Sequence, residues 1–577
     1  MRMNKKYTLI LFCLMATLLS ACNVFGGGNT TIAKKLVKAP ASKQVLVIPE
    51  VGIKDFTTLD PALAFPSDTP SLSAIQMVFT GLVQLDDNLQ VRPQLAQTWD
   101  LAPDGVTWTF HLRPHLKFSD GTPLTSTDIA YSIDRALQPT TKSTTAPNYL
   151  ALIKDSDQML AGTRQTLIGD SLLTPNDSTL MIVARKKAAY FLSMLTYTCS
   201  YVVERRLIDK YGANFTAHLN EGAGAGPFKV LQYIHGQEID FVRNPNYYGS
   251  QPQLQRVTLR FYQNANDAYQ AYQLGNVDTT GVPMSTFASD KKRKDFFQVP
   301  QLWNDYYTMN YLVKPFDNIH IRQAFALAID KTAIANKVWK GTVLPTNHIV
   351  PQGMAGYNPN LTGPDGTQSL KGNPDKARAL LAKGLTEEGW TSVSQMPAIT
   401  LTYATGTGTT NFDHEVMEMI SMWQSVLGVT VTPDPVDLNT LLDKVTAATN
   451  NPNGLQFWGL SWVAEYPDPQ DWLTLQFDNG VPNNSMNYGQ NFSTDAARQQ
   501  LTQQQLETAD VNTAHPDARL QTYQQAEQQL VDDVAWLPME QVTTTFLRQP
   551  TVIGMVDNAE SLIPPDDWGK IYIAEYA

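Results

Sequence analysis

Alternating apolar and polar residues predict several β-strands in the first half of the chain. A run with this alternation occurs at residues 106–112, and further strand-like runs occur at residues 178–183, 238–243 and 257–262. Between the first two runs, apolar residues recur at helical spacing over residues 126–137, which predicts a helix with Ser126 or Thr127 as its N-cap. This succession predicts a compact α+β unit in this part of the chain.

Predicted strands and helices alternate most clearly between residues 399 and 460. The strands are residues 399–403, 429–432 and 455–460, and the helices are residues 414–427 and 438–448. Gly428 ends the longer helix, as glycine commonly does after a helix C-terminus. A β-α-β-α-β succession builds a parallel or mixed sheet, so we predict an α/β fold for this unit.

The segment after the third of these strands, residues 461–472, is the best candidate site by position. Ligands of such sheets bind beyond the carboxyl ends of the strands. The segment combines carboxylates and aromatic rings, namely Trp462, Glu465, Tyr466, Asp468, Asp471 and Trp472. This set suits a cationic or amphipathic ligand. The same residues are also typical of a rigid Tyr-Pro-Asp-Pro turn with tryptophans that face the core, and both interpretations stay open.

The N-terminus carries the one long apolar run of the chain, residues 9–19, preceded by Arg2, Lys5 and Lys6. A basic region followed by an apolar run and small residues is typical of a secretory signal, and this run is too short to span a bilayer. The run ends in Leu-Ser-Ala-Cys, which resembles the lipobox of bacterial lipoproteins. Cys22 is therefore expected to become the lipidated first residue, although an ordinary signal with a coincidental cysteine is the alternative.

Residues 22–43 are predicted to form a flexible lipidated tether, because three consecutive glycines and a mixture of Lys, Ala and Pro cannot form a core. Residues 1–21 would be removed as the signal peptide. The folded body would then be exported and held at the outer face of the cytoplasmic membrane, or in the periplasm, by the lipid on Cys22.

Composition and charge exclude other classes. With 577 residues, of which 43% are hydrophobic and 17% charged, the chain is globular and long enough for about three or four domains. The net charge is −11 and no basic block follows the N-terminus, so nucleic acid is not an expected partner. Cys199 is expected to be a small buried hydrophobe. His111 and His115 lie on a predicted strand and turn, so no metal or cofactor is predicted.

Gly169-Asp170-Ser171 matches the short block around the nucleophile of one esterase family. In that family an Asp-x-x-His near the C-terminus completes the site. Here the only such string, residues 317–320, opens a predicted helix far from the C-terminus. A turn that enters the strand at residues 178–183 is the preferred interpretation, and a lipid-anchored esterase is kept as a remote alternative.

Several segments together resemble one protein family, in that family's order and over about residues 45–575. They are residues 104–113 (DGVTWTFHLR), 117–123 (KFSDGTP), 224–230 (GAGPFKV), 244–248 (NPNYY) and 321–325 (IRQAF). By these segments the chain resembles the extracellular solute-binding proteins, family 5, of oligopeptide and dipeptide ABC importers.

The resemblance implies an α/β fold of the periplasmic-binding-protein type, in which two lobes joined by a hinge close on a ligand. The implied arrangement has three domains, one of them a small α+β insert. The expected boundaries are residues 44–76, 190–305 and 536–577 for a discontinuous domain I, 77–189 for the inserted domain II, and 306–535 for domain III, the second lobe.

In peptide binders of this family a carboxylate binds the α-ammonium of an extended peptide. The resemblance places this role on Glu465, three residues after Trp462, which would form a wall of the site; the family pattern has Asp there, and Glu is longer by a methylene. Asp468 is the second choice for the ammonium. Segments that border the cleft in relatives contain Phe65, Ser67, Tyr149 and Trp303.

The implied partners are a peptide ligand and the permease and ATPase subunits of an ABC importer, with the chain as a monomer. The same fold also carries oligosaccharides, nickel chelates, opines or heme in relatives, so a non-peptide cargo is the main alternative. A sugar binder would use Trp458, Trp462 and Trp472 as stacking platforms and would not need Glu465. A ligandless chaperone or signalling receptor also stays open.

Overall fold

A computed structural model describes residues 35–406, 411–491 and 495–577. The predicted signal peptide, the lipidation site Cys22 and most of the predicted tether lie outside these residues. Within the described part of the chain, no helix combines the length and the apolar character that a membrane crossing requires.

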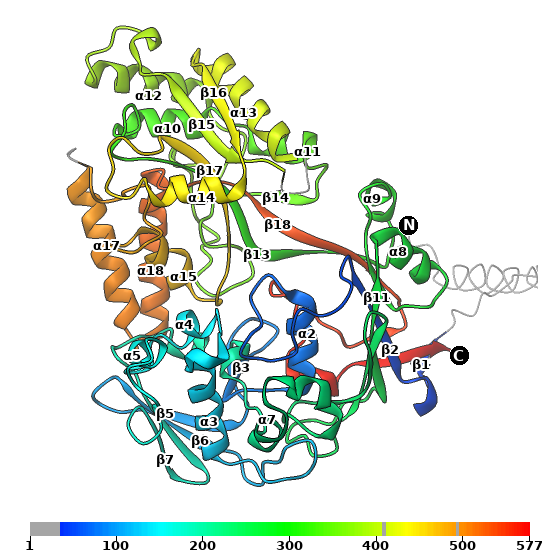
Figure 1. Ribbon diagram of the computed structural model, residues 1–577. Helices are drawn as coiled ribbons and strands as arrows, with labels where there is room; N and C mark the ends of the chain where they lie inside the picture. Colours follow the sequence, from blue (N-terminus) through cyan, green and yellow to red (C-terminus); the bar gives the residue numbers. More distant parts are fainter. Residues whose placement is uncertain (1–34, 407–410, 492–494) are drawn as a thin grey trace, which may run out of the picture.

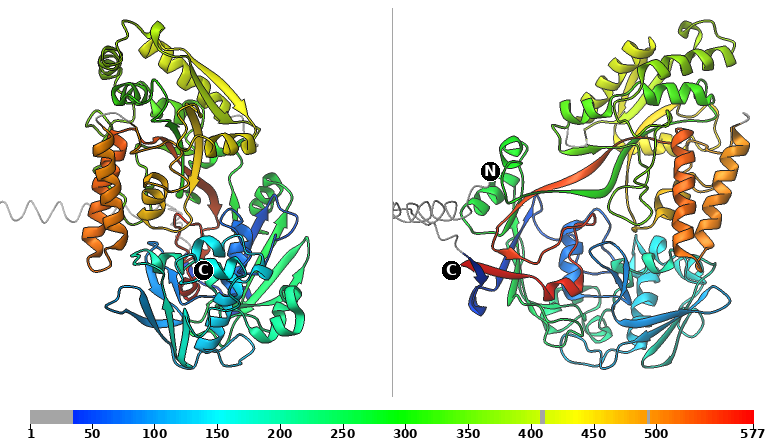
Figure 2. Two further views of the ribbon diagram at one scale, coloured as in Figure 1. Left: turned by 60° about the vertical axis from the view of Figure 1, so that its left-hand side comes forward. Right: turned by 180° about the vertical axis from the view of Figure 1, so that it is seen from behind.

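Two long antiparallel strands connect two lobes (Figure 1). They are β13 (Phe296–Met309) and β18 (Leu537–Arg548), which pair with each other from Phe296 and Leu547 at one end to Tyr307 and Leu537 at the other. Both views of Figure 2 show this pair running from the lower lobe into the upper one. Each strand therefore belongs to both lobes.

The lower lobe is built on a four-stranded sheet in the order β2-β11-β10-β9. Its strands are β2 (Val45–Val51), β11 (Arg256–Tyr262), β10 (Glu238–Arg243) and β9 (Phe228–Ile234), with β2 parallel to β11 and the other pairs antiparallel. Alternate apolar residues of these strands share a core with helix α2 (Thr69–Val78). The strands at 238–243 and 257–262 were predicted and are confirmed.

A second antiparallel sheet, in the order β5-β6-β8-β7, lies within residues 96–183. Its strands are β5 (Ala96–Leu101), β6 (Thr107–Leu112), β8 (Thr179–Val183) and β7 (Leu172–Asn176). Helix α3 (Ser126–Leu137) shares their buried core. The predicted cap of this helix is wrong by one residue, because Thr125 is the N-cap and its N–H donates to the Asp128 carboxylate at 2.8 Å.

The upper lobe contains the largest sheet, in which β14 pairs with β18 and the main order is β12-β18-β13-β17-β15-β16. The further strands are β12 (Thr279–Gly281), β14 (Val343–Pro345), β15 (Ile399–Ala404), β16 (Val431–Val436) and β17 (Phe457–Val463). Since β15 is parallel to β16 and β17 while β17 is antiparallel to β13, the predicted mixed sheet is confirmed.

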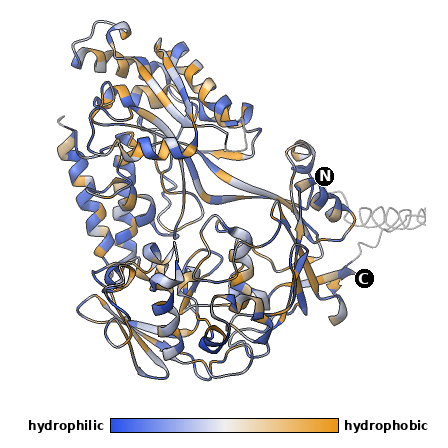
Figure 3. Cartoon of the chain, in the orientation of Figure 1, coloured by the Kyte–Doolittle hydropathy of each residue, from blue (hydrophilic) through white to orange (hydrophobic). Residues whose placement is uncertain are grey.

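Helices pack on this sheet in two groups, each sharing a core with it. One group is α10 (Ile319–Leu327), α12 (Pro374–Glu387) and α13 (Asn411–Leu427), and the other is α14 (Leu438–Thr446), α17 (Ala496–Val511) and α18 (Pro516–Asp532). Apolar residues concentrate toward the strands, while outer helices such as α17 are largely hydrophilic (Figure 3).

The remaining elements are short. They are β3 (Val83–Leu85), β4 (Val91–Pro93), β19 (Val552–Ile553), α4 (Ala146–Tyr149), α5 (Ser156–Leu160), α6 (Phe191–Met194), α7 (Arg205–Tyr211), α8 (Ala265–Gln273), α9 (Phe287–Asp290), α11 (Lys331–Lys337), α15 (Pro469–Trp472) and α16 (Thr474–Phe477). Cys199, on a short turn of this kind, is a free buried thiol as predicted.

The predicted tether ends earlier than residue 43. Strand β1 (Leu36–Lys38) pairs antiparallel with β20 (Tyr572–Tyr576), and a short helical turn at Ala41–Lys43 follows. The prediction for residues 35–43 is therefore wrong. A strand of three residues has too few positions to show alternation, and its pairing depends on a partner at the far end of the chain.

Gln44 fixes this N-terminal segment, and its replacement by Ala is predicted to destabilise the lower lobe. Its amide donates to the carbonyls of Ala39 at 2.7 Å and Ile573 at 2.8 Å, and it accepts from the Ile573 N–H at 2.9 Å, with the residue only 1% exposed. Losing these bonds leaves buried backbone groups unpaired, so the free energy of unfolding should fall by about 2–3 kcal/mol.

Chemical denaturation measures this change. Gln232→Ala is the matched control, because Gln232 is exposed on the same lobe, and it should change the free energy of unfolding by less than about 0.5 kcal/mol. Equal effects of the two substitutions would contradict the role given to Gln44.

Candidate functional site

The ladder between β13 and β18 is interrupted where the two strands pass between the lobes. Regular pairs end at Pro300 opposite Thr543 and resume at Asn304 opposite Gln541. Residues 301–303 therefore leave the ladder. An interruption of this kind bends a strand and frees its side chains to point elsewhere.

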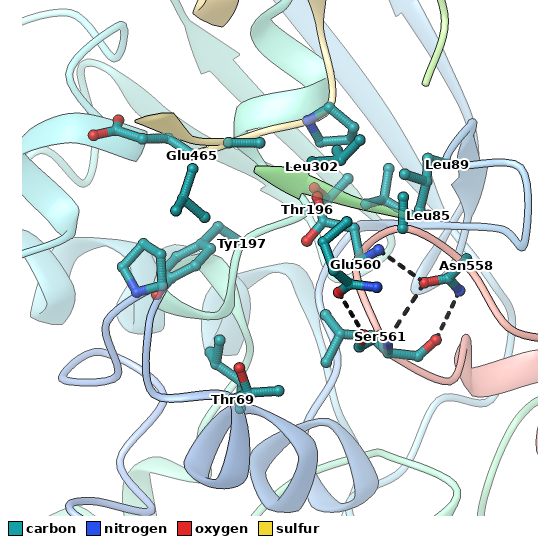
Figure 4. Close-up of a pocket in the computed structure, with 18 of the residues that line it drawn as sticks. Thr69, Leu85, Leu89, Thr196, Tyr197, Leu302, Glu465, Asn558, Glu560 and Ser561 are labelled. Carbon is teal, nitrogen blue, oxygen red and sulfur yellow. Dashed lines mark hydrogen bonds between the residues drawn. The ribbon is translucent and has the colours of Figure 1, made fainter. Parts of the chain in front are cut away.

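The freed residues line a cavity between the lobes, called here the cleft cavity, with a volume of about 410 Å³. Figure 4 shows its walls, with Glu465 on the β17 side and Thr69 at the start of α2 opposite. Lining segments from both lobes contribute, including Pro66, Ser67, Leu85, Asp86, Leu89, Thr196–Thr198, Gln301–Trp303, Val463–Glu465 and Asn558–Leu562. The walls are mostly apolar, with carboxylates and amides at single positions.

The backbone of Leu302 joins three segments around this cavity. Its N–H donates to the Ala559 carbonyl at 3.1 Å, and its carbonyl accepts from the Ala464 N–H at 2.9 Å. Gln301 accepts a hydrogen bond from the Ser561 hydroxyl at 2.6 Å. The break in β13 therefore fixes both the end of β17 and the C-terminal loop around residue 560.

The lobes also meet at a second place, away from the connecting strands. The Ala189 N–H donates to the Asp510 carbonyl at 2.8 Å, and the rings of Tyr190 and Tyr466 stack with centroids 6.0 Å apart. The space between the lobes is thus bordered by residues of β13 and β18 on one side and by these aromatic rings on the other.

Glu465 follows directly on β17 and carries an unpaired charge. Its backbone N–H donates to Asp471 Oδ2 at 3.2 Å, but its side-chain carboxylate makes no hydrogen bond or ion pair with the described residues. Burial raises the pKa of Glu465 above its ordinary value. A cationic group that reaches this carboxylate would supply the missing partner.

Polar atoms without partners lie behind Glu465. Tyr149 is 1% exposed, stacks on Tyr197 with centroids 3.8 Å apart, and its hydroxyl has no hydrogen-bond partner in the described residues. Asp471 is fully buried and its Oδ1 also lacks a partner. Burial, followed by the charge of Glu465, raises the pKa of Asp471 well above its ordinary value.

The sequence and structure of this chain match known proteins over most of its length. The pattern of the family described as bacterial extracellular solute-binding proteins, family 5 Middle, matches residues 90–484. The chain belongs to this family. Its members are binding proteins for extracellular solutes.

Two curated relatives of this chain are named for different cargoes. The oligopeptide-binding protein OppA of Bacillus subtilis is 26% identical over 562 residues, which cover 96% of this chain and 97% of OppA. The probable deoxycholate-binding periplasmic protein YgiS of Escherichia coli is 29% identical over 456 residues, 77% of this chain and 81% of YgiS.

A solved structure of the periplasmic murein tripeptide binding protein MppA, in its unliganded open form, superposes with a TM-score of 0.79 at 25% identity. The match covers 94% of this chain and 99% of that one. A second structure, of MppA from Escherichia coli, gives 0.63 at 25% identity over 92% and 99%. The chain therefore superposes better on the structure described as the unliganded open form than on the second one.

The predicted site residues of this family 5 chain separate into two groups. Ser67, Trp303 and Glu465 line the cleft cavity, whereas Phe65, 39% exposed, and Trp462 do not. The Trp462 indole instead donates to Asp471 Oδ2 at 3.1 Å. Its position also differs from the prediction, because β17 continues to Val463, so Trp462 is part of the strand and not of the loop that follows.

Asp468 is engaged elsewhere, so its prediction as second ammonium partner is wrong. It is 6% exposed and accepts two hydrogen bonds from Arg519, at 2.9 and 2.5 Å, while also capping α15 through the Gln470 N–H. The Asp-Pro pair that follows Tyr466 looked like part of a ligand loop, but its charge is already neutralised inside the upper lobe.

The structure does not support the stacking of a sugar on Trp458 and Trp472, nor an esterase site at Ser171. Trp458 and Trp472 are 1% and 0% exposed, so they cannot present faces to a sugar. Ser171 is fully buried and its hydroxyl has no hydrogen-bond partner in the described residues, and Asp170 beside it pairs with Lys154 and Arg164. A serine nucleophile needs an accessible hydroxyl bonded to a base, and Ser171 offers neither.

Residues that pattern analysis missed complete the cleft cavity, above all Tyr197, Leu302 and Glu560. Glu560 is brought to the site by the bond between Leu302 and Ala559, which joins positions more than 250 residues apart in the chain. The only signal in the sequence was a charged residue in a C-terminal loop of mixed polarity. That signal does not distinguish a cleft residue from a solvated one.

Arg519→Met is predicted to destabilise the upper lobe, because it leaves the buried Asp468 carboxylate without its partner. Removing one member of a buried ion pair lowers the free energy of unfolding by about 3–5 kcal/mol. Arg378→Met is the control, since Arg378 pairs with Asp375, whose side chain is 96% exposed, and should cost at most about 1 kcal/mol. Denaturant unfolding compares the two, and a small effect of Arg519→Met would contradict the structural role given to Asp468.

Proposed function

We propose that this family 5 protein is the substrate-binding component of an ABC importer and captures extracellular oligopeptides in the cleft cavity. The observation that carries the proposal is the unpaired carboxylate of Glu465 at the wall of a mostly apolar cavity between two lobes. The α-ammonium of a peptide would be the positively charged partner that this carboxylate lacks. Similarity to OppA over nearly the whole of both chains supports the same cargo.

Closure would follow from contacts that exist only when both lobes touch the peptide. In this structure Glu465 belongs to the β17 side, while Ser67 and Thr69 belong to the lower lobe. A ligand that bridges them binds the closed state more tightly, and this difference in affinity shifts the population toward closure. The closed form would then engage the permease of the importer, with its ATPase subunits providing the energy.

The remaining parts of the proposal concern location and chemistry. Export through residues 1–21 and a lipid on Cys22 would hold the protein at a membrane surface, with a tether now limited to residues 22–34. The protein would act as a monomeric binding protein and not as an enzyme. Deoxycholate is an alternative cargo, because the relative YgiS is named for it, and it serves as a competing ligand in the tests of this proposal.

Glu465→Gln is predicted to weaken the binding of peptides that have a free N-terminus. The substitution keeps the shape of the side chain and removes its charge, so affinity should fall on the order of 10- to 100-fold, the value of a charge-assisted bond. Isothermal titration calorimetry measures this with alanine oligopeptides. The same peptides with an acetylated N-terminus should bind wild type weakly and should lose nothing further in the variant.

Asp86→Asn is the matched control, because Asp86 lines the same cavity but its carboxylate already accepts from Arg92 at 2.7 Å. It should leave peptide affinity nearly unchanged. Equal losses for free and acetylated peptides in Glu465→Gln would contradict the ammonium role. Tight binding of deoxycholate with no binding of any peptide would contradict the peptide function itself.

The pH dependence of binding gives a further prediction. Burial raises the pKa of Glu465, and only its ionised form pairs with an ammonium. Affinity for free peptides is therefore fully present above this raised pKa and falls as pH drops through it, while the α-ammonium itself stays charged up to about pH 8. Titrations between pH 4 and pH 7 test this, and the same slope for acetylated peptides would contradict it.

A further inference from the structure

A second cavity, called here the hinge cavity, adjoins the cleft cavity and has a volume of about 340 Å³. Val299 of β13 and Phe546 of β18 form part of its wall, so it lies against the strands that connect the lobes. The two cavities share lining residues, namely Thr69, Gln76, Thr544, Asn558, Ser561 and Leu562. A ligand in the cleft cavity can therefore extend a side chain into the hinge cavity.

The hinge cavity has apolar walls and an unpaired carboxylate. Met77, Leu259 and Phe546 are among its apolar residues, and Glu50 of β2 contributes the carboxylate. The Glu50 side chain makes no hydrogen bond or ion pair with the described residues, and burial raises its pKa to about 8. The other acid of the wall, Asp557, is neutralised by Arg548 through bonds of 2.7 and 2.9 Å.

Asp68, which does not line the hinge cavity but acts electrostatically on Glu50, supplies a second sign that a cation is missing near that residue. It is 7% exposed, and its Oδ1 accepts from the Ser71 N–H at 3.3 Å as the cap of α2, but its Oδ2 has no partner in the described residues. Its negative charge acts on Glu50, adding to the effect of burial on the pKa of that group. Two carboxylates that repel each other in a buried region are stabilised when a cation joins them.

The ionisable side chains that line the two cavities are acidic. The cleft cavity contributes Glu465 and Glu560, and the hinge cavity contributes Glu50, whereas neither cavity is lined by a Lys, Arg or His among the described residues. One carboxylate suffices for an α-ammonium. The others would ionise when a cation pairs with them, and would therefore favour a basic peptide over an acidic one.

We propose that the hinge cavity is a subsite for a Lys or Arg side chain of the bound peptide, with Glu50 as the carboxylate that binds its charge. The inference rests on the proposed peptide function. The apolar walls accommodate the methylene stem of such a side chain, and the cation lies at Glu50 with the charge of Asp68 beside it. The preferred cargo is therefore a basic oligopeptide and not any peptide of suitable length.

Calorimetry with a positional peptide series tests the subsite. Pentapeptides of alanine carry a single lysine at position 2, 3, 4 or 5, and each is compared with the peptide that has norleucine at the same position, which keeps the stem without the charge. At one position lysine should bind about ten-fold tighter than norleucine. Glu50→Gln should remove this advantage and leave the norleucine affinity unchanged, which also shows that the variant is folded.

Control variants separate this subsite from its surroundings. Glu238→Gln removes a carboxylate from the same lobe outside both cavities and should keep the lysine advantage. Glu465→Gln should weaken the lysine and norleucine peptides equally. A lysine advantage that persists in Glu50→Gln, or is absent at every position, would overturn the subsite while the peptide function stands; no binding of any pentapeptide to the wild type would overturn both.

Discussion

The paired strands β13 and β18 are the constraint on which the rest of the structure depends. They belong to both lobes, and the main gap in their ladder lies at residues 301–303, with a further shift of register between Asp305 and Tyr306. A continuous ladder resists bending, so motion between the lobes would concentrate where pairing fails. The same three residues line the cleft cavity, and Leu302 among them bonds to Ala464 and Ala559. In the proposed mechanism, hinge and binding site would thus share one piece of backbone, and a ligand that contacts this piece would act directly on the angle between the lobes.

Unpaired carboxylates line both cavities. Several buried acids elsewhere have donors: Asp60 pairs with Arg135, Asp468 pairs with Arg519, and Glu527 accepts the N–H groups of residues 349 and 350. Placing a carboxylate in a partly dry site without a donor costs stability. Glu465, Glu560 and Glu50 carry this cost together at the junction of the lobes. A cationic ligand would remove it, so part of the binding energy in the proposed function would come from carboxylates that have no protein partner in the free chain.

The sequence predicted the local elements better than the site they build. Periodicity located α3 and the β-α-β-α-β unit within a few residues, because amphipathic patterns depend on near neighbours in the chain. It also pointed to the segment at the end of β17, which contains Glu465. It assigned Asp468 to the ligand because the pairing with Arg519, on a later helix, leaves no local trace. It did not identify β1 or the role of Glu560, since each depends on a contact with a distant part of the chain.

The chemical nature of the natural cargo is the central claim, and the protein itself can report it. The measurement is mass spectrometry of the small molecules released when the mature chain, purified under native conditions without added ligand, is denatured. The account predicts a mixture of short peptides with free N-termini, enriched in lysine and arginine relative to the peptides of the growth medium. A single non-peptide compound, or peptides enriched in acidic residues, would contradict it.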